Sequence, residues 1–232
     1  MPDTKIVVIS GAGISAESGL ATFRDSGGLW EGYNIEDVAS PQGWQENPRK
    51  VLEFYNLRRK KAAEVQPNEA HKALADLEDD FEVVIVTQNV DDLHERAGST
   101  DVIHLHGELR KARSVKDEAL VTDIGSDPIH LGDLAEDGSQ LRPHVVWFGE
   151  MVPMIEFGAK EVSEADILIV VGTSLVVYPA AGLIEYTKPN IPKYIIDPAE
   201  PQLFNLDGWV HYKEKAGSGV KKLIKKLKKE HS

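Results

Sequence analysis

The sequence predicts an α/β fold in which a doubly wound parallel sheet carries a small second lobe. Short apolar runs rich in Val and Ile recur along the chain, and continuous runs of this kind are typical of strands buried on both faces. Segments with helical spacing lie between them, and this alternation favours a parallel sheet covered by helices. The predicted strands are Lys5–Ser10, Glu82–Thr87, Asp101–Leu105, Ala165–Val171, Lys193–Asp197 and, more weakly, Trp209–Tyr212.

Two long stretches interrupt this rhythm and predict the second lobe. Asp25–Gln66 separates the first two strands, and the polar, turn-rich Arg110–Arg142 separates the third from the fourth. Both are long for connections in a compact domain, so we expect two insertions that pack together. The large domain is then predicted at residues 1–30, 67–109 and 145–232, and the small lobe at residues 31–66 and 110–144.

Three segments carry clear helix signals. Asn68–Leu77 begins after Pro67, and Ala180–Tyr186 follows Pro179 in the same way. In the Lys-rich C-terminal segment, apolar residues at helical spacing predict an amphipathic helix that docks on the domain. These residues are Val220, Leu223, Ile224 and Leu227.

Composition and charge exclude several classes of protein. The 232 residues include 26 Lys and Arg against 38 Asp and Glu, a net charge of −12, which excludes a uniformly basic nucleic-acid surface. The chain has no Cys, which excludes disulfides, thiol nucleophiles and Cys-ligated metals. No apolar run reaches the roughly 18–20 residues of a membrane span. We expect a cytoplasmic protein that binds neither nucleic acid nor membranes.

A glycine-rich loop follows the first strand directly. Gly11 and Gly13 would let the backbone approach a pyrophosphate, and a helix after the loop would offer its N-terminus to the charge. A tight turn without a ligand is the alternative. A dinucleotide dehydrogenase needs a second strand with an acidic end about 20 residues further on, but residues 22–30 have the composition of a loop. The sequence therefore favours a dinucleotide without standard hydride transfer.

Polar side chains gather where other predicted strands end. Gln88, Asn89 and Asp91 suit ribose hydroxyls and a carboxamide, although an Asn/Asp turn would use the same residues. Residues 172–174 suit a phosphate or ribose, or form a helix cap. His104 and His106 share one face if their strand extends that far, and a histidine in such a place is often only a hydrogen-bonded core residue.

Five blocks in order resemble the signatures of the sirtuins, the NAD-dependent protein-lysine deacylases. The blocks are Gly11–Trp30, Thr87–Asp91, His104–Leu109, Arg142–Glu150 and Gly172–Leu175. The resemblance spans most of the chain and implies a Rossmann-like large domain, a smaller lobe, and a cleft between them for NAD and an acyl-lysine peptide. It implies NAD contacts for Gly11, Ala12, Gly13, Ala16, Glu17, Thr22, Phe23, Arg24, Trp30, Gln88, Asn89, Val90, Asp91, His106, Gly172, Thr173, Ser174, Asp197 and Ala216.

The resemblance also implies the chemistry. Asn89 and Asp91 would face the nicotinamide ribose, and His106 would act as the general base, for which a pKa near 6.5 is suitable. The implied products are nicotinamide, O-acyl-ADP-ribose and free lysine. Asp197 departs from the Asn that related sequences often carry, so its contact with the adenosine ribose is a weaker expectation.

Tyr55 and Arg58 are the most informative residues for the substrate. They lie three apart, on one face of a helix, where spacing alone would allow a solvated basic face. They match the Tyr-x-x-Arg of class III sirtuins, which remove succinyl, malonyl and glutaryl groups. Arg58 can bind a distal carboxylate through two hydrogen bonds, and Tyr55 can add a hydroxyl donor. Four further residues resemble the strand that pairs with the substrate peptide: Val146, Trp147, Phe148 and Gly149.

Most sirtuins carry two Cys-x-x-Cys pairs for a structural zinc, so this Cys-free chain is expected to be a zinc-free variant. We expect no metal, a small lobe held by apolar side chains, and a monomer that acts on acylated-lysine proteins. An ADP-ribosyltransferase or NAD glycohydrolase is one alternative, and a non-catalytic NAD or ADP-ribose sensor is another. The apolar residues expected to hold the lobe are Leu120, Val121, Ile124, Ile129, Leu131, Leu134 and Leu141.

Overall fold

The computed structural model describes residues 4–22, 29–30, 32–201 and 207–230. The sheet order is β11-β10-β9-β1-β4-β5, and all its pairings are parallel. All six strands predicted for this parallel sheet are therefore confirmed. The strands of this sheet are β1 (Lys5–Ser10), β4 (Glu82–Thr87), β5 (Val102–His104), β9 (Ile167–Val171), β10 (Lys193–Ile196) and β11 (Trp209–Tyr212).

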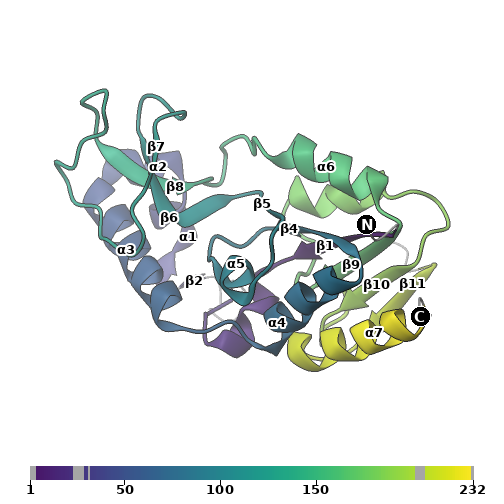
Figure 1. The fold of residues 1–232 in the computed structure, drawn as a ribbon. Helices are drawn as coiled ribbons and strands as arrows, with labels where there is room; N and C mark the ends of the chain where they lie inside the picture. Colours follow the sequence, from purple (N-terminus) through teal and green to yellow (C-terminus); the bar gives the residue numbers. More distant parts are fainter. Residues whose placement is uncertain (1–3, 23–28, 31, 202–206, 231–232) are drawn as a thin grey trace.

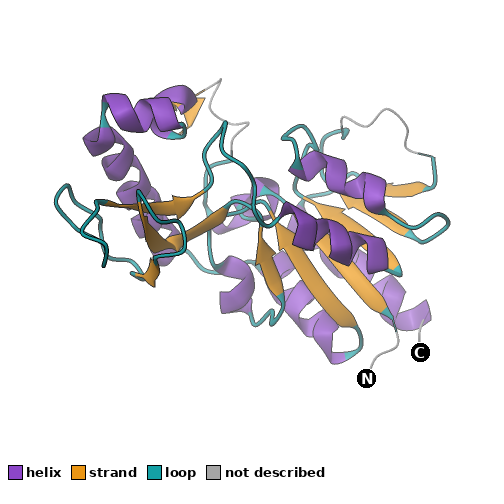
Figure 2. Cartoon of the chain, turned by 90° about the horizontal axis from the view of Figure 1, so that it is seen from above, coloured by secondary structure: helices purple, strands orange, loops and turns teal. Residues whose placement is uncertain are grey.

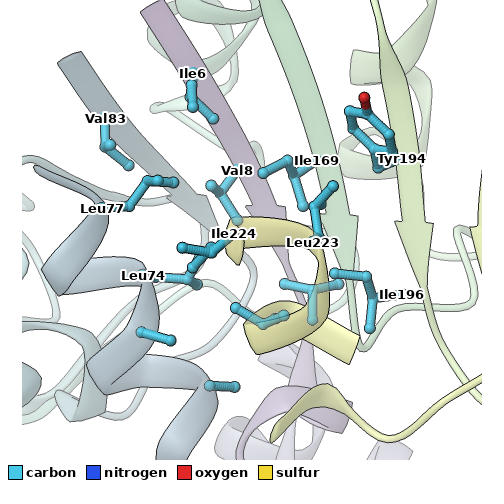
Figure 3. Close-up of a cluster of buried hydrophobic side chains, with 14 of the residues drawn as sticks. Ile6, Val8, Leu74, Leu77, Val83, Ile169, Tyr194, Ile196, Leu223 and Ile224 are labelled. Atoms are coloured by element: carbon cyan, nitrogen blue, oxygen red, sulfur yellow. The ribbon is translucent and has the colours of Figure 1, made fainter. Parts of the chain in front are cut away.

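Helices cover both faces of this sheet (Figures 1 and 2). On one face, α4 (Glu69–Asp76) and α7 (Ala216–Glu230) pack side by side, and their apolar residues interdigitate with Ile6, Val8 and Ile169 (Figure 3). The predicted amphipathic character of α7 is thereby confirmed. The other face is covered by α6 (Ile155–Glu164) and the 3-10 helix η4 (Ala180–Tyr186). Burying apolar surface on both faces of the sheet provides most of the stabilisation of the large domain.

The first insertion is mainly helical. A two-stranded hairpin precedes three helices, and α3 is the longest of them. Its helices begin at good caps: Ser40 accepts from the Gly43 amide, and Asn47 accepts from the Lys50 amide. The elements are β2 (Leu29–Trp30), β3 (Tyr33–Asn34), α1 (Ile35–Val38), α2 (Pro41–Glu46) and α3 (Pro48–Glu64).

The second insertion forms an antiparallel sheet that the sequence did not predict. Its strand order is β7-β6-β8, and it packs beside α3 to complete the small lobe (Figure 1). Gly107 opens β6 at φ +76, where a Cβ would lie 2.1 Å from the His144 carbonyl oxygen, so only glycine fits. The strands are β6 (Gly107–Ser114), β7 (Val121–Asp123) and β8 (Leu141–Val145). Because β6 and β8 cross the predicted boundaries, the exact division into domains stays a prediction.

Apolar packing explains only part of this lobe, so the expectation for its core was partly wrong. Ile129 is buried, but Val121, Leu131 and Leu134 are 38%, 44% and 60% exposed. Side chains in short polar loops face water more readily than their composition suggests. The remaining predicted residues, Leu120, Ile124 and Leu141, are half-buried.

Ion pairs and polar hydrogen bonds supply the rest of the small lobe's interior. Arg113, only 5% exposed, lies 3.2 Å from Glu118 and 3.6 Å from Glu150, and Arg142 pairs with Glu150 at 2.6 Å. The Ser114 hydroxyl donates to Asp137 and accepts from the Lys116 amide. Paired buried charges of this kind fix one arrangement of the strands.

Candidate active site

A cavity of about 890 Å³ lies between the carboxyl ends of the parallel strands and the small lobe. This volume is within the range of roughly 300–1,000 Å³ that is typical of ligand pockets. Every described residue predicted to contact NAD or substrate lines it, whereas Phe23 and Arg24 lie outside the described residues. The cavity thus brings together segments from residue 11 to residue 216.

The glycine loop closes one wall of the cavity, in a form that differs from the expectation. Two 3-10 turns, η1 (Ala12–Ile14) and η2 (Ala16–Ser18), follow it in place of a long helix, so the predicted helix N-terminus is wrong. Gly19 at φ +97 ends the second turn. Asn68 anchors the turns by donating to the Ile14 carbonyl at 2.7 Å and to the Ser18 hydroxyl at 3.0 Å.

The glycines serve close packing between two loops. The amides of Gly11 and Gly13 donate to the carbonyls of Val171 and Gly172, at 3.1 and 2.8 Å. A Cβ on Gly13 would lie 2.7 Å from the Gly172 carbonyl oxygen. Both glycines line the cavity, but their own amides are already used. The absence of side chains at Gly11 and Gly13 therefore lets the glycine-rich loop approach the loop after β9 closely.

Ser15 joins the two polar residues that the sequence placed at the nicotinamide ribose. The Asn89 side-chain amide donates to the Ser15 hydroxyl at 3.1 Å, and that hydroxyl donates to the Asp91 carboxylate at 3.2 Å. All three residues are buried. Burial raises the pKa of Asp91, while the Leu93 amide and the Ser15 hydroxyl oppose that rise. The two side chains are therefore held in fixed positions in the cavity wall.

His106 lines the same cavity with a defined tautomer. β5 ends at His104, so His106 lies in a turn and does not continue the strand. Its Nδ1 lies 3.0 Å from the Gln88 carbonyl oxygen, which can only accept, so Nδ1 carries the proton and Nε2 keeps its lone pair. Burial lowers the pKa of His106, and the hydrogen bond to Gln88 partly offsets this. The imidazole is thus neutral at pH 7 and able to accept a proton at Nε2.

His104 has a structural environment, in contrast to His106. Its Nδ1 donates to the Asn89 carbonyl at 2.9 Å, and its Nε2 lies 2.6 Å from the Glu95 carboxylate. Burial lowers the pKa of His104, but its bonds to Glu95 outweigh burial and raise it. His104 therefore holds the backbone of Asn89 in place from behind.

A second set of buried hydrogen bonds supports Asn89 from within the large domain. The Asn89 amide donates to the Thr87 hydroxyl oxygen at 3.0 Å, which also accepts from Ser10 at 2.8 Å. The ring of His94 lies 2.9 Å from the Ser10 hydroxyl through Nε2. Burial holds the pKa of His94 well below its usual value, so this ring stays neutral. The chain of contacts makes Thr87 a positioning residue for Asn89.

Thr87→Val tests that role. Valine keeps the shape but leaves the buried Asn89 amide without its acceptor, which costs roughly 1–3 kcal/mol. We expect at least a tenfold fall in turnover of the reaction that the resemblance implies, with the hydroxyl-bearing Thr87→Ser near wild type. Turnover of Thr87→Val equal to that of Thr87→Ser would show that the hydroxyl positions nothing.

Tyr55 and Arg58 lie together at the small-lobe end of the cavity, as predicted. The Arg58 guanidinium carbon lies 4.1 Å from the centre of the Trp30 ring, a cation–π distance. Tyr55 is fully buried, and no atom lies within good hydrogen-bond geometry of its hydroxyl. Burial raises the Tyr55 pKa, so the phenol stays a neutral donor. This end of the cavity therefore presents a guanidinium together with a neutral phenol hydroxyl.

An ion pair fixes the wall that faces Tyr55. Arg142 donates to both oxygens of Glu150, at 2.6 and 3.1 Å, and its guanidinium carbon lies 3.2 Å from the Trp147 ring centre. Glu150 also accepts from the Trp147 amide at 2.8 Å. The prediction of a strand over Val146–Gly149 is wrong, because β8 ends at Val145 and a turn follows. Trp147 is held by Glu150 instead, and its neighbours still line the cavity.

The opposite end of the cavity contains the residues expected at the adenosine side. Asp197 follows β10, is 5% exposed, and accepts from the Ala199 amide at 2.8 Å. Ala216 begins α7, and the next amide, of Gly217, donates to Glu17 at 2.7 Å. Glu17 thus links the glycine-loop turns to α7.

Sequence reasoning missed Ser15 and the Arg142–Glu150 pair as supports of the site. Ser15 lies inside the glycine-rich block, so its position in the sequence could have indicated that it lies at the site. The Arg142–Glu150 contact spans eight residues around a turn, and no local pattern reveals such a pair. Among the described residues, no group of three or more His, Asp or Glu side chains is arranged to hold a metal ion. Zinc independence stays a prediction that rests on the absence of Cys.

A parallel α/β sheet with a polar cavity at its carboxyl edge, closed by a small lobe, is the arrangement in which nucleotide-binding α/β proteins hold their ligands. The Sir2 family model matches residues 11–179. The chain is 58% identical over 193 residues to an NAD-dependent protein deacylase of Helicobacter pylori strain J99, covering 83% of this chain and 82% of that relative. A Bacteroides thetaiotaomicron protein of the same name is 49% identical over 224 residues, covering 94% and 95%. The chain therefore belongs to the Sir2 family.

Solved structures agree with this assignment. A Sir2 homologue in complex with NAD superposes with a TM-score of 0.87 at 41% identity, covering 98% of this chain and 91% of that one. A Sir2 protein bound to a p53 peptide and NAD+ gives 0.79 at 28% identity, covering 96% and 93%. The predicted Rossmann-like fold with a small second lobe is confirmed. No helix in the described part of the chain is both long and apolar enough to cross a bilayer.

Proposed function

We propose that this chain is an NAD-dependent protein-lysine deacylase that prefers acyl groups ending in a carboxylate, succinyl above all, with malonyl, glutaryl and acetyl groups as further substrates. The observation that carries the proposal is the pairing of Arg58 and Tyr55 at one end of the cavity that His106 also lines. A guanidinium matches the planar geometry of a carboxylate, and a buried phenol adds a neutral donor. An acetyl group has no carboxylate for these two donors to bind.

The described residues fit NAD. The cavity is large enough, and it offers buried amide and carboxylate groups from Asn89 and Asp91 for a ribose, with further polar groups at Asp197. When bound, NAD supplies an electrophilic sugar carbon with nicotinamide as the leaving group. Asn89 and Asp91 orient the sugar, and Trp147 and Tyr55 exclude water from the acyl end. His106 accepts a proton at Nε2 and passes it on as the reaction completes.

The pH dependence follows from the tautomer and burial of His106. Only the neutral imidazole accepts a proton, and burial lowers its pKa below the ordinary value of about 6.5. Protonation, and with it the loss of turnover, therefore begins at a lower pH than for an exposed histidine. We expect the acid limb of the kcat profile for desuccinylation below pH ~6.5. An acid limb above that value would contradict a neutral, buried base.

The direct test is deacylation of matched lysine peptides followed by mass spectrometry. We expect loss of succinyl, malonyl and glutaryl groups only with NAD present, faster than loss of acetyl from the same peptide. Faster removal of acetyl would contradict the proposed preference. From composition we also propose a cytoplasmic, monomeric, zinc-free enzyme that acts on acylated proteins.

A further inference from the structure

Arg59 is a buried cation with no acidic partner among the described residues. It is 2% exposed, in the middle of the interface between α3 and β6. Its Nε donates to the Leu109 carbonyl at 2.5 Å, and its Nη1 donates to the Asn56 side-chain oxygen at 2.8 Å. Nη2 is buried and has no hydrogen-bond partner. Both bonds go to neutral groups, so the charge itself is not compensated.

Burial of this charge is unfavourable as it stands. Desolvation lowers the pKa of Arg59 to about 10, and no neighbouring carboxylate counteracts this. A buried cation is normally paired, because an uncompensated charge and an unsatisfied N–H both destabilise the folded state. The other buried arginines of the small lobe follow that rule, since Arg113 and Arg142 both pair with Glu150. Arg59 is therefore the exception among these three buried arginines.

A hollow of about 360 Å³, separate from the large cavity, lies over Arg59. It is lined by the end of α3, the segment that leads into α5 (Leu93–Ala97) and the start of β6. Arg96 joins α5 to the end of α3 by donating to the Ala62 and Val65 carbonyls. The hollow is large enough for a small oxyanion. It is lined by Arg59, Ala62, Ala63, Asp91, Asp92, Arg96, Leu109, Arg110, Gly125 and Ser126.

The two carboxylates in the hollow are already engaged. Asp92 pairs with Arg96 and with Arg110, each at 3.3 Å, and Arg110 also lies 3.6 Å from Asp123. Asp91 accepts from the Ser15 hydroxyl and the Leu93 amide. The charges of Asp92, Asp123, Arg96 and Arg110 are thus balanced among themselves, and none of these carboxylates pairs with Arg59.

We propose that this hollow is a second ligand site, which binds one oxyanion of phosphate size against the Arg59 guanidinium. Guanidinium hydrogens match the oxygens of phosphate in geometry as well as charge. The anion neutralises Arg59, which lines the hollow, while Ser126 and Arg110 border the opening. Asp91 lines both this hollow and the large cavity, so the second site lies directly behind the catalytic wall.

The test is equilibrium dialysis of the full chain with radiolabelled inorganic phosphate at constant ionic strength. Saturating ADP-ribose occupies the large cavity, so phosphate cannot be counted there. We expect one bound phosphate per wild-type chain and at least tenfold weaker binding to Arg59→Met, since a charge-assisted contact is lost. Arg49→Met removes an exposed positive charge from the same helix, and we expect it to bind phosphate as wild type does.

A second variant keeps the test decisive if Arg59→Met does not fold. Ala63 is exposed at the edge of the hollow, so Ala63→Glu places a carboxylate where the anion would bind without disturbing the core. We expect this variant, with a wild-type circular dichroism spectrum, to lose the bound phosphate. Absence of bound phosphate on the wild type, or wild-type binding by Ala63→Glu, would overturn the proposal. Because no turnover is measured, this outcome is independent of the deacylase activity.

Discussion

Replacing Arg58 with methionine is expected to lower kcat/KM for a succinyl-lysine peptide by roughly tenfold to a hundredfold, and to change it little for the acetyl form of the same peptide. The factor follows from losing a charge-assisted hydrogen bond, worth roughly 1.5–3 kcal/mol. Methionine keeps the aliphatic bulk beside Trp30 and removes only the guanidinium that the distal carboxylate would meet.

Two controls make the Arg58 result specific. Tyr55→Phe removes only the hydroxyl. We expect it to lower kcat/KM for the succinyl peptide and not for the acetyl peptide, by a smaller factor than Arg58→Met does. Arg49→Met removes an exposed charge from the same helix and should leave both substrates unaffected. If Arg58→Met lowered succinyl and acetyl turnover equally, Arg58 would stabilise the helix or the nucleotide site, and the proposed acyl preference would lose its physical basis.

Replacing His106 with alanine is expected to reduce deacylation of every acyl peptide by roughly 10²–10⁴-fold, the range over which a positioned general base contributes. The imidazole sits at the cavity wall with Nε2 available, so its loss removes the proton acceptor without removing a core side chain. Turnover at neutral pH with saturating NAD is the measurement.

The fold and the nucleotide site should survive this change. ADP-ribose affinity and the thermal midpoint of His106→Ala are the checks, and His130→Gln, an exposed histidine of the small lobe, is the matched control with wild-type activity expected. Substantial residual turnover in His106→Ala would assign the proton transfer to another group.

The large domain was predictable because its strands are buried on both faces. Runs such as Glu82–Thr87 contain little but β-branched residues, and only a parallel sheet buries such a run completely. The start of α4 was equally local, since Asn68 caps it directly after Pro67, the residue that signals the helix in the sequence. These features depend on residues close together in the chain, and for such features periodicity and capping are sufficient to predict the element.

The small lobe was not predictable in the same way. Its strands contain Arg113 and Arg142, which are buried only because Glu118 and Glu150 pair with them. A pattern that assigns charged residues to the surface cannot anticipate such pairs, because the acidic partner comes from a different loop. Apolar residues such as Leu134 were assigned inward but lie outside, because they belong to short polar loops on the surface.

The candidate site was also predictable only in part. The residues at the ends of strands, Asn89 and Asp91 among them, converge because parallel strands bring their carboxyl ends to one edge. Two hydrogen bonds hold Asn89 in place. The bond to Ser15 joins segments more than 70 residues apart, and the bond to Thr87 spans a turn of two residues. Such contacts depend on packing distances that no spacing rule contains.

Nicotinamide release is the most direct measurement of whether cleavage of NAD in this cavity depends on an acylated lysine. Purified protein and NAD are combined with succinyl-lysine, acetyl-lysine or unmodified lysine versions of one peptide. We predict release with both acylated peptides, faster with the succinyl form, and none with the unmodified peptide. Equal release without any acyl group would identify a glycohydrolase, and no release with any peptide would contradict catalysis at this site altogether.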